Sequence, residues 1–200
     1  MKILRGKDWF AGKDLEGFLH RSGLKAQGWS DKSFKNKPII GIANSWSEAT
    51  HCNSNLKELA EHVKRGIIEA GGFPLEFPTI SLGEFFLNPT SMYCRNLMSM
   101  DVEEMIRGLP IDAVVLLSGC DKTTPAMLMG ALSSDIPSIL LTSGPQLKGN
   151  WRGESLGSCT DCRRYWSELR AGNITQDQYD SLESAIYRSK GHCMVMGTAS

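Results

Sequence analysis

This sequence has no excess of charge, no long apolar run and no leader-like beginning. Its 22 Lys and Arg residues balance 22 Asp and Glu residues. A nucleic-acid-binding protein is expected to carry a basic face, so this balance argues against that class but leaves room for a local patch. The densest apolar run, residues 113–117, is far too short to cross a bilayer, and residues 1–10 hold no hydrophobic signal segment. We therefore expect a cytosolic protein that binds neither membrane nor nucleic acid.

Two common binding motifs are also missing. Residues 149–157 contain glycines but match neither phosphate-binding pattern, G-x-x-x-x-G-K-[ST] or G-x-G-x-x-G, so nucleotide binding has little support. Cys159-x-x-Cys162 lacks the second pair that a zinc ribbon needs. We interpret this pair as structural or incidental, and Cys94 as a packing residue. The rival hypothesis is a non-catalytic zinc or redox-binding module built on Cys159 and Cys162.

The chain does have the length and composition of a globular domain. Of its 200 residues, 41% are hydrophobic and 22% are charged, which is ordinary for a soluble protein with a core. Residues 1–37, rich in Lys, Gly and Ser, are interpreted as an N-terminal arm with a short helix around 15–21. Residues 38–200 are interpreted as one α/β domain that binds metal. We expect it to be incomplete, because a loop assigned below to the site lies close to Ser200.

Apolar runs alternate with helical patterns throughout residues 38–200. Four short runs predict buried strands, at 39–43, 75–80, 113–117 and 137–141. This alternation predicts an α/β fold, with a parallel sheet covered by helices on both faces in an α/β/α sandwich. Helices are predicted at 56–67, where Gly71-Gly72 gives the stop, and within 91–107, where Asp101-x-x-Glu104 is a capping box that restarts the helix. A third helix is predicted from Thr124 to Leu132, with Pro125 at its first position. A fourth contains Tyr179, Leu182 and Ile186 and begins at a capping box, Thr175-x-x-Gln178.

Three cysteines fall in short polar loops, and we place them on one rim of the predicted sheet. Cys52, Cys120 and Cys193 are too far apart in sequence for a zinc knuckle or a thioredoxin-like motif. Ligands bind beyond the carboxyl ends of parallel strands, and Cys52 and Cys120 follow the first and third strands. Any one cysteine is best explained as a small buried side chain, but three on one rim favour a ligand set. Soft thiolates bind iron–sulfur clusters, zinc or Cu(I), and a three-cysteine set leaves one cluster position open.

Charged side chains fall at the same predicted rim. Glu84 follows the second strand and Asp121 the third, and hard carboxylate oxygens suit Mg²⁺. Asp121 has an equally good structural interpretation as the cap of the following helix. Lys122 would ligate Mg²⁺ only as a carbamate. His51 and His192 each adjoin a candidate cysteine, where a role in tuning the site and a plain surface role are both open.

These residues resemble the N-terminal part of the dihydroxy-acid and sugar-acid dehydratase family. The combination of the Gly-Cys-Asp-Lys segment with two further cysteines is highly specific, and the resemblance covers most of the chain from Pro38 onward. The matching segments are 41–45, 50–53 (Thr-His-Cys-Asn), 118–125 (Ser-Gly-Cys-Asp-Lys-Thr-Thr-Pro) and 191–200 (Gly-His-Cys-Met-Val-Met-Gly-Thr-Ala-Ser).

The resemblance implies a role for each rim residue. Three cysteines of the family hold a [2Fe–2S] cluster, a role that falls here on Cys52, Cys120 and Cys193. A nearby Mg²⁺ is bound by an acidic residue, by the Asp of Gly-Cys-Asp-Lys and by the next Lys as a carbamate. The list of implied Mg²⁺ ligands is therefore Glu84, Asp121 and Lys122. The family's general base is a serine in a C-terminal β-barrel-like domain absent from these 200 residues, so we expect this chain alone to be inactive.

The segment after the second strand points to one branch of the family. Branched-chain members usually carry Asp-Gly there. This chain instead has Gly-Glu-Phe-Phe-Leu-Asn-Pro-Thr at 83–90 and Met-Tyr-Cys-Arg-Asn at 92–96. That departure resembles the pentonate dehydratases, such as L-arabinonate or D-xylonate dehydratase. We expect a hydro-lyase that converts an aldonate, a pentonate, into a 2-keto-3-deoxy acid, in a homo-oligomer that is a dimer or a tetramer. The alternative is dihydroxy-acid dehydratase of branched-chain amino-acid biosynthesis.

Overall fold

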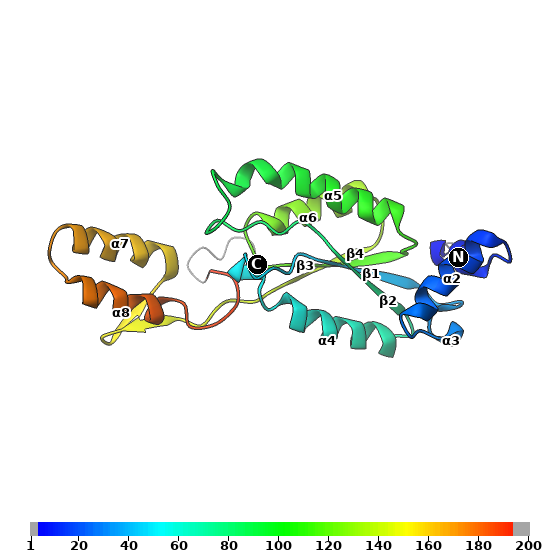
Figure 1. Ribbon diagram of the computed structural model, residues 1–200, viewed down its shortest axis with the longest axis horizontal. Helices are drawn as coiled ribbons and strands as arrows, with labels where there is room; N and C mark the ends of the chain where they lie inside the picture. Colours follow the sequence, from blue (N-terminus) through cyan, green and yellow to red (C-terminus); the bar gives the residue numbers. More distant parts are fainter. Residues whose placement is uncertain (1–3, 194–200) are drawn as a thin grey trace.

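The computed structural model describes residues 4–193, apart from the side chains of Ser158 and Cys159. The last seven residues of the 191–200 motif therefore lie outside the described part. The N-terminal arm is more helical than expected, because helix α2 (Leu15–Ala26) is joined by α1 (Arg5–Ala11) and α3 (Asp31–Phe34). Asp14 begins α2, since its carboxylate accepts a hydrogen bond from the Gly17 N–H at 2.9 Å. The arm lies at one end of the molecule (Figure 1).

A four-stranded parallel sheet forms the centre, in the order β2-β1-β3-β4. Its strands are β1 (Ile39–Asn44), β2 (Phe73–Pro78), β3 (Ala113–Ser118) and β4 (Ser138–Thr142). The central strands β1 and β3 are almost entirely apolar, as strands covered on both faces should be. The predicted α/β class is confirmed.

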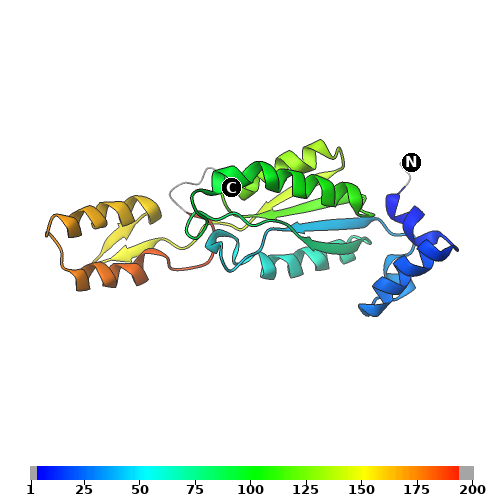
Figure 2. The ribbon, with the colours of Figure 1, turned by 45° about the horizontal axis from the view of Figure 1, so that its top comes forward.

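Helices cover the two faces of this sheet, as Figures 1 and 2 show. Helix α4 (Leu56–Glu69) packs on one face, where its apolar stripe meets Ile42 and Leu117. Helices α5 (Cys94–Gly108) and α6 (Thr123–Ser133) pack on the other face, against Val114 and Leu116. Neighbouring residues of β3 thus enter opposite cores, as the period-2 alternation of a strand requires. No helix of the described part is long and apolar enough to span a membrane.

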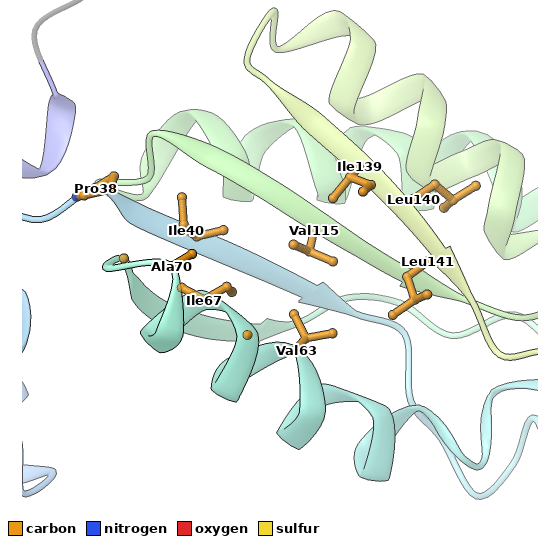
Figure 3. Close-up of a pocket in the computed structure, with 11 residues that line it drawn as sticks. Pro38, Ile40, Val63, Ile67, Ala70, Val115, Ile139, Leu140 and Leu141 are labelled. Carbon is orange, nitrogen blue, oxygen red and sulfur yellow. The ribbon is translucent and has the colours of Figure 1, made fainter.

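The face that carries α4 is only partly covered. A groove of about 390 Å³ lies between α4 and the far strands, lined almost entirely by apolar side chains. Figure 3 shows Val63 and Ile67 of α4 on one side, with Ile139 and Leu141 of the edge strand β4 on the other. Ile139 is 64% exposed and Leu141 40% exposed.

A small lobe projects from the sheet on the side opposite the N-terminal arm (Figures 1 and 2). It consists of a hairpin, β5 (Gly149–Trp151) and β6 (Glu154–Leu156), with helices α7 (Ser158–Arg170) and α8 (Gln176–Ile186). Its own apolar cluster contains Leu156, Tyr165, Leu182 and Ile186. The predicted capping box of Thr175 and Gln178 is present at the start of α8.

Three details of the sequence interpretation were wrong. The second strand, predicted at 75–80, spans Phe73–Pro78. It is an edge strand whose Phe73 N–H donates to Pro38 O, so Pro74 and Pro78 face away from the neighbouring strand, where no N–H donor is needed. Asp101 caps no helix, since α5 is continuous there and its carboxylate accepts the Ile80 N–H at 3.0 Å. Pro125 is the third residue of α6, a place in the first turn where no intrahelical acceptor awaits its missing N–H.

Candidate metal centre

Two of the sequence-predicted cysteines, Cys52 and Cys120, meet at the carboxyl ends of the strands, and the backbone of Cys193 reaches Cys52. Cys52 lies in the short helix η1 (His51–Asn53) after β1, and Cys120 follows β3. Residues 191–193 join the same rim, because His192 pairs with Pro145 just beyond β4, with His192 N–H donating to Gly144 O at 3.0 Å.

The loops that carry Cys52 and Cys120 touch through Gly119. A Cβ at that position would collide with the Cys52 carbonyl oxygen and with the Ser143 side chain. A residue with a side chain would therefore push the two cysteine loops apart, and glycine is required by close approach rather than by backbone angle. Cys120 is held in turn by a hydrogen bond from its N–H to Thr123 Oγ1 at 3.0 Å.

Cys52 and Cys120 share one proton between two sulfurs. A hydrogen bond from the Cys120 thiol lowers the pKa of Cys52 to about 5; burial opposes that change, and His51 and the backbone N–H of Cys193 assist it. The pKa of Cys120 is raised, first because it is the donor to the Cys52 thiolate and second because it is buried. Cys52 is thus a thiolate at neutral pH, the form that binds metals.

The two cysteine side chains at the rim are soft donors. Within residues 4–193, no three His, Cys, Asp or Glu side chains converge closely enough to hold one metal ion. The soft donors that do meet are the Cys52 and Cys120 sulfurs, with the Cys193 backbone directed at Cys52. Thiolate donors of this kind are the ligands of iron–sulfur clusters.

The charged residues predicted to bind Mg²⁺ also meet. Lys122 Nζ lies 2.6 Å from Asp121 Oδ2 and 2.8 Å from Glu84 Oε1. Lys122 is buried. Burial alone would lower its pKa, but its hydrogen bonds to the two carboxylates outweigh that effect and raise it. For Asp121, burial acts to raise the pKa, and the hydrogen bond from Lys122 reverses this and lowers it.

The Lys122 ammonium therefore lies between two carboxylates. The carboxylates of Glu84 and Asp121 are hard oxygen donors, as Mg²⁺ requires. An ammonium has no lone pair to offer, so Lys122 would become a ligand only after its amine carries a carboxyl group. The donor chemistry of all three residues fits Mg²⁺ if Lys122 is carbamylated.

The β3–α6 turn places soft and hard donors side by side. Cys120, Asp121 and Lys122 are consecutive, and the turn is fixed by the hydrogen bond between the Ser118 and Thr124 hydroxyls at 2.8 Å. The alternative in which Asp121 caps α6 is wrong, because the helix makes no side-chain cap there. Asp121 Oδ1 lies 3.2 Å from Cys120 Sγ instead, so this carboxylate contacts both halves of the site.

The two histidines differ in their surroundings. His51 has both ring nitrogens 3.8 Å from Cys52 Sγ, and its ring packs against Phe85 and Tyr187. His192 is buried and places Nδ1 3.2 Å from the Cys193 carbonyl oxygen. The sequence interpretation did not single out Phe85 or Tyr187 as site residues. Phe85 could have been suspected from its position next to Glu84, whereas no local signal marks Tyr187.

The Cys159-x-x-Cys162 pair lies at the start of α7, in the lobe. Cys162 packs against the apolar cluster of the lobe, and its Sγ lies 3.9 Å from the Tyr187 hydroxyl. The side chain of Cys159 lies outside the described residues. Cys94 packs against the main core at the start of α5, as expected.

Comparison with known proteins connects this site to one family. Residues 37–200 match the model of the dihydroxy-acid/6-phosphogluconate dehydratase N-terminal family. The chain is 54% identical over 198 residues to a putative dehydratase of Rhizobium meliloti (strain 1021), covering 99% of this chain and 34% of that protein. It is 55% identical over 186 residues to L-arabonate dehydratase of Azospirillum brasilense, covering 93% of this chain and 32% of that protein.

A third relative acts as a contrast. The chain is 37% identical over 192 residues to dihydroxy-acid dehydratase of Methanobrevibacter smithii (strain ATCC 35061 / DSM 861 / OCM 144 / PS), covering 94% of this chain and 35% of that protein. The chain thus spans about a third of the length of these relatives.

Proposed function

The chain belongs to the dihydroxy-acid/6-phosphogluconate dehydratase family through its N-terminal domain, and from that premise we propose that the full-length protein is a sugar-acid dehydratase. It would remove water from a 2,3-dihydroxy acid and release a 2-keto-3-deoxy acid, using a [2Fe–2S] cluster and Mg²⁺. The observation that carries this proposal is the contact of Lys122 with Glu84 and Asp121, immediately beside the hydrogen-bonded cysteines Cys52 and Cys120.

Cys52, Cys120 and Cys193 would hold the cluster, and Glu84, Asp121 and carbamylated Lys122 would hold Mg²⁺. When bound, these groups supply Lewis acids for the substrate carboxylate, the 2-hydroxyl and the leaving 3-hydroxyl. The neighbours of Cys52 lower its pKa, which favours the thiolate form that binds metals. Asp121 touches both donor sets and fixes their spacing.

The remaining steps need groups beyond these 200 residues. The C2 proton must leave to a general base, a role that the family resemblance gives to a serine of the C-terminal domain. This chain would contribute orientation, because Asp121 joins the residues that would hold the cluster to those that would hold Mg²⁺. We also propose that the full-length protein is a homo-oligomer.

A pentonate is the favoured substrate class. The relative named L-arabonate dehydratase is 55% identical to this chain, whereas the relative named dihydroxy-acid dehydratase is 37% identical. The segment from Gly83 to Asn96 is polar and aromatic, as a site for a polyol chain would need. The second candidate, dihydroxy-acid dehydratase, is supported only by that lower identity.

An assay of the full-length protein tests the proposal. Protein purified without oxygen should absorb visible light, contain about two irons per chain, and form a 2-keto acid from L-arabinonate or D-xylonate in the presence of Mg²⁺. A colourless protein that binds zinc in stoichiometric amount after anaerobic reconstitution, and that dehydrates none of these acids, would support the rival zinc-binding module instead.

A further inference from the structure

Three aromatic rings pack together beside Cys52. The His51 ring centroid lies 4.8 Å from that of Phe85 and 5.2 Å from that of Tyr187, and the Phe85 and Tyr187 centroids are 5.7 Å apart. All three pairs meet edge to face, the arrangement that aromatic rings favour. Each ring comes from a different loop of the rim, so the cluster joins loops that are far apart in the sequence.

Each ring is also close in sequence to a proposed ligand. His51 precedes Cys52, Phe85 follows Glu84, and Tyr187 lies on the segment that leads to Cys193. We propose that this ring cluster is a positioning device, in which Phe85 fixes the position of Glu84 relative to Cys52. The inference rests on the proposed function, because it takes Glu84 to be a Mg²⁺ ligand.

The segment that carries Glu84 is anchored at both ends but exposed between them. Leu82 is buried and Leu87 packs against the main core, so the segment is fixed on both sides of Glu84. Between them, Glu84 has a 59% exposed side chain and Phe86 is 73% exposed. Phe85 is the residue of this exposed stretch that packs on other rings, which makes it the natural anchor for its neighbour Glu84.

The loop that carries Glu84 touches the loop that carries Cys52 at two points. Gly83 approaches Thr50 so closely that a Cβ there would lie 2.9 Å from Thr50 Oγ1, and Thr50 is buried. Phe85 then meets His51, the next residue along the other loop. This two-point contact fixes both the position and the rotation of the Glu84 segment relative to Cys52. Removing one of the two contacts should leave the segment in place but should no longer hold the Glu84 carboxylate in one position.

Tyr187 extends the device to the lobe. It follows the end of α8, and its hydroxyl lies 3.9 Å from Cys162 Sγ within the lobe. Its ring closes the cluster against both His51 and Phe85. The lobe is thereby connected to the rim at the place where the chain turns toward Cys193.

The test replaces Phe85 in the full-length protein and measures metal binding directly. Mn²⁺ is the probe for the Mg²⁺ site, titrated against the protein and followed by electron paramagnetic resonance. Phe85→Ala is expected to weaken Mn²⁺ binding about tenfold, the order of effect that loss of aromatic ring pairs allows. Iron per chain should stay at the wild-type value because the ring binds no iron, and the melting temperature should fall only slightly because the ring that loses its two contacts is half exposed.

Two further variants separate positioning from a general structural role. Phe85→Tyr keeps the ring and should retain wild-type Mn²⁺ affinity. Phe86→Ala, the matched control one residue away, removes a more exposed ring of the same type and should change nothing. Phe85→Ala with wild-type Mn²⁺ affinity, or an equal loss in Phe86→Ala, would overturn the positioning role. If the wild-type protein binds no Mn²⁺ and holds no iron, the proposed function itself is wrong. That outcome is distinct from the two results that overturn only the role of Phe85.

Discussion

Lys122 Nζ lies 2.8 Å from Glu84 Oε1, which joins the loop after β3 to the loop after β2 across the strand β1 that separates them in the sheet. The same ammonium lies 2.6 Å from Asp121 Oδ2. These two carboxylates around one buried lysine are the residues that we propose as Mg²⁺ ligands. This relationship leads to the first prediction.

Replacing Lys122 by Ala in the full-length protein should lower turnover by about a hundredfold or more, because several kcal/mol of metal-assisted stabilisation of the transition state is lost. Iron content should stay the same, since Lys122 contributes no thiolate. The measurement pairs kcat with iron per chain. Lys25→Ala, which removes an exposed ion pair with Asp31 in the N-terminal arm, is the control and should be silent. Near-normal turnover in Lys122→Ala would exclude the carbamate-ligand role.

The second prediction concerns the thiolates. Cys52→Ser and Cys120→Ser should each lose the visible absorption of the cluster, because a hydroxyl is a poor replacement for a soft thiolate ligand. Cys94→Ser should keep the absorption, since Cys94 packs against the core at the start of α5. Spectra and iron analysis of protein purified without oxygen provide the measurement. Loss of colour in all three variants alike would indicate a folding defect and leave no special role for Cys52 and Cys120.

Gly119 gives the third prediction. Gly119→Ala places a methyl group against the Cys52 carbonyl and the Ser143 side chain, so the two cysteine loops must separate. Overpacking of this kind costs about 1–3 kcal/mol. We expect a lower melting temperature together with reduced iron per chain. Gly23→Ala is the matched control: it lies inside α2, a Cβ there meets no atom within 4 Å, and the same substitution should be neutral or stabilise by about 0.5–1 kcal/mol. Equal iron content in both variants would count against the close approach at Gly119.

The sheet could be predicted from the sequence because its strands are buried on both faces. The run from Ala113 to Leu117 is apolar at every position, and it forms the strand β3 between two helical layers. The hairpin of β5 and β6 escaped detection because its strands have only three residues each. Its turn residues Arg152 and Gly153 both have positive φ, as such a turn needs, but arginine is not the residue that normally signals it.

The gathering of site residues was predictable only in part. Parallel strands bring their carboxyl ends to one rim, so the meeting of Cys52 with Cys120, and of Glu84 with Lys122, followed from topology. The ring contact of Tyr187 with His51 did not, because Tyr187 reaches the rim from the end of the lobe. Contacts of that kind depend on how the lobe is attached, and no local pattern in the sequence encodes that attachment.

The last prediction concerns the substrate. A site that hydrogen-bonds each hydroxyl of a polyol chain strongly rejects an analogue that lacks those hydroxyls, because its buried polar groups are left unpaired. The segment from Gly83 to Asn96 supplies polar and aromatic side chains beside the proposed Mg²⁺ ligand Glu84. We therefore expect the full-length protein to have a higher kcat/KM for C5 or C6 aldonates than for 2,3-dihydroxyisovalerate, by about 10²-fold or more. Both substrate classes should be compared on one preparation with known iron and Mg²⁺ content, so that metal loading cannot account for the difference. A higher kcat/KM for 2,3-dihydroxyisovalerate would contradict the aldonate proposal and favour dihydroxy-acid dehydratase of branched-chain amino-acid synthesis.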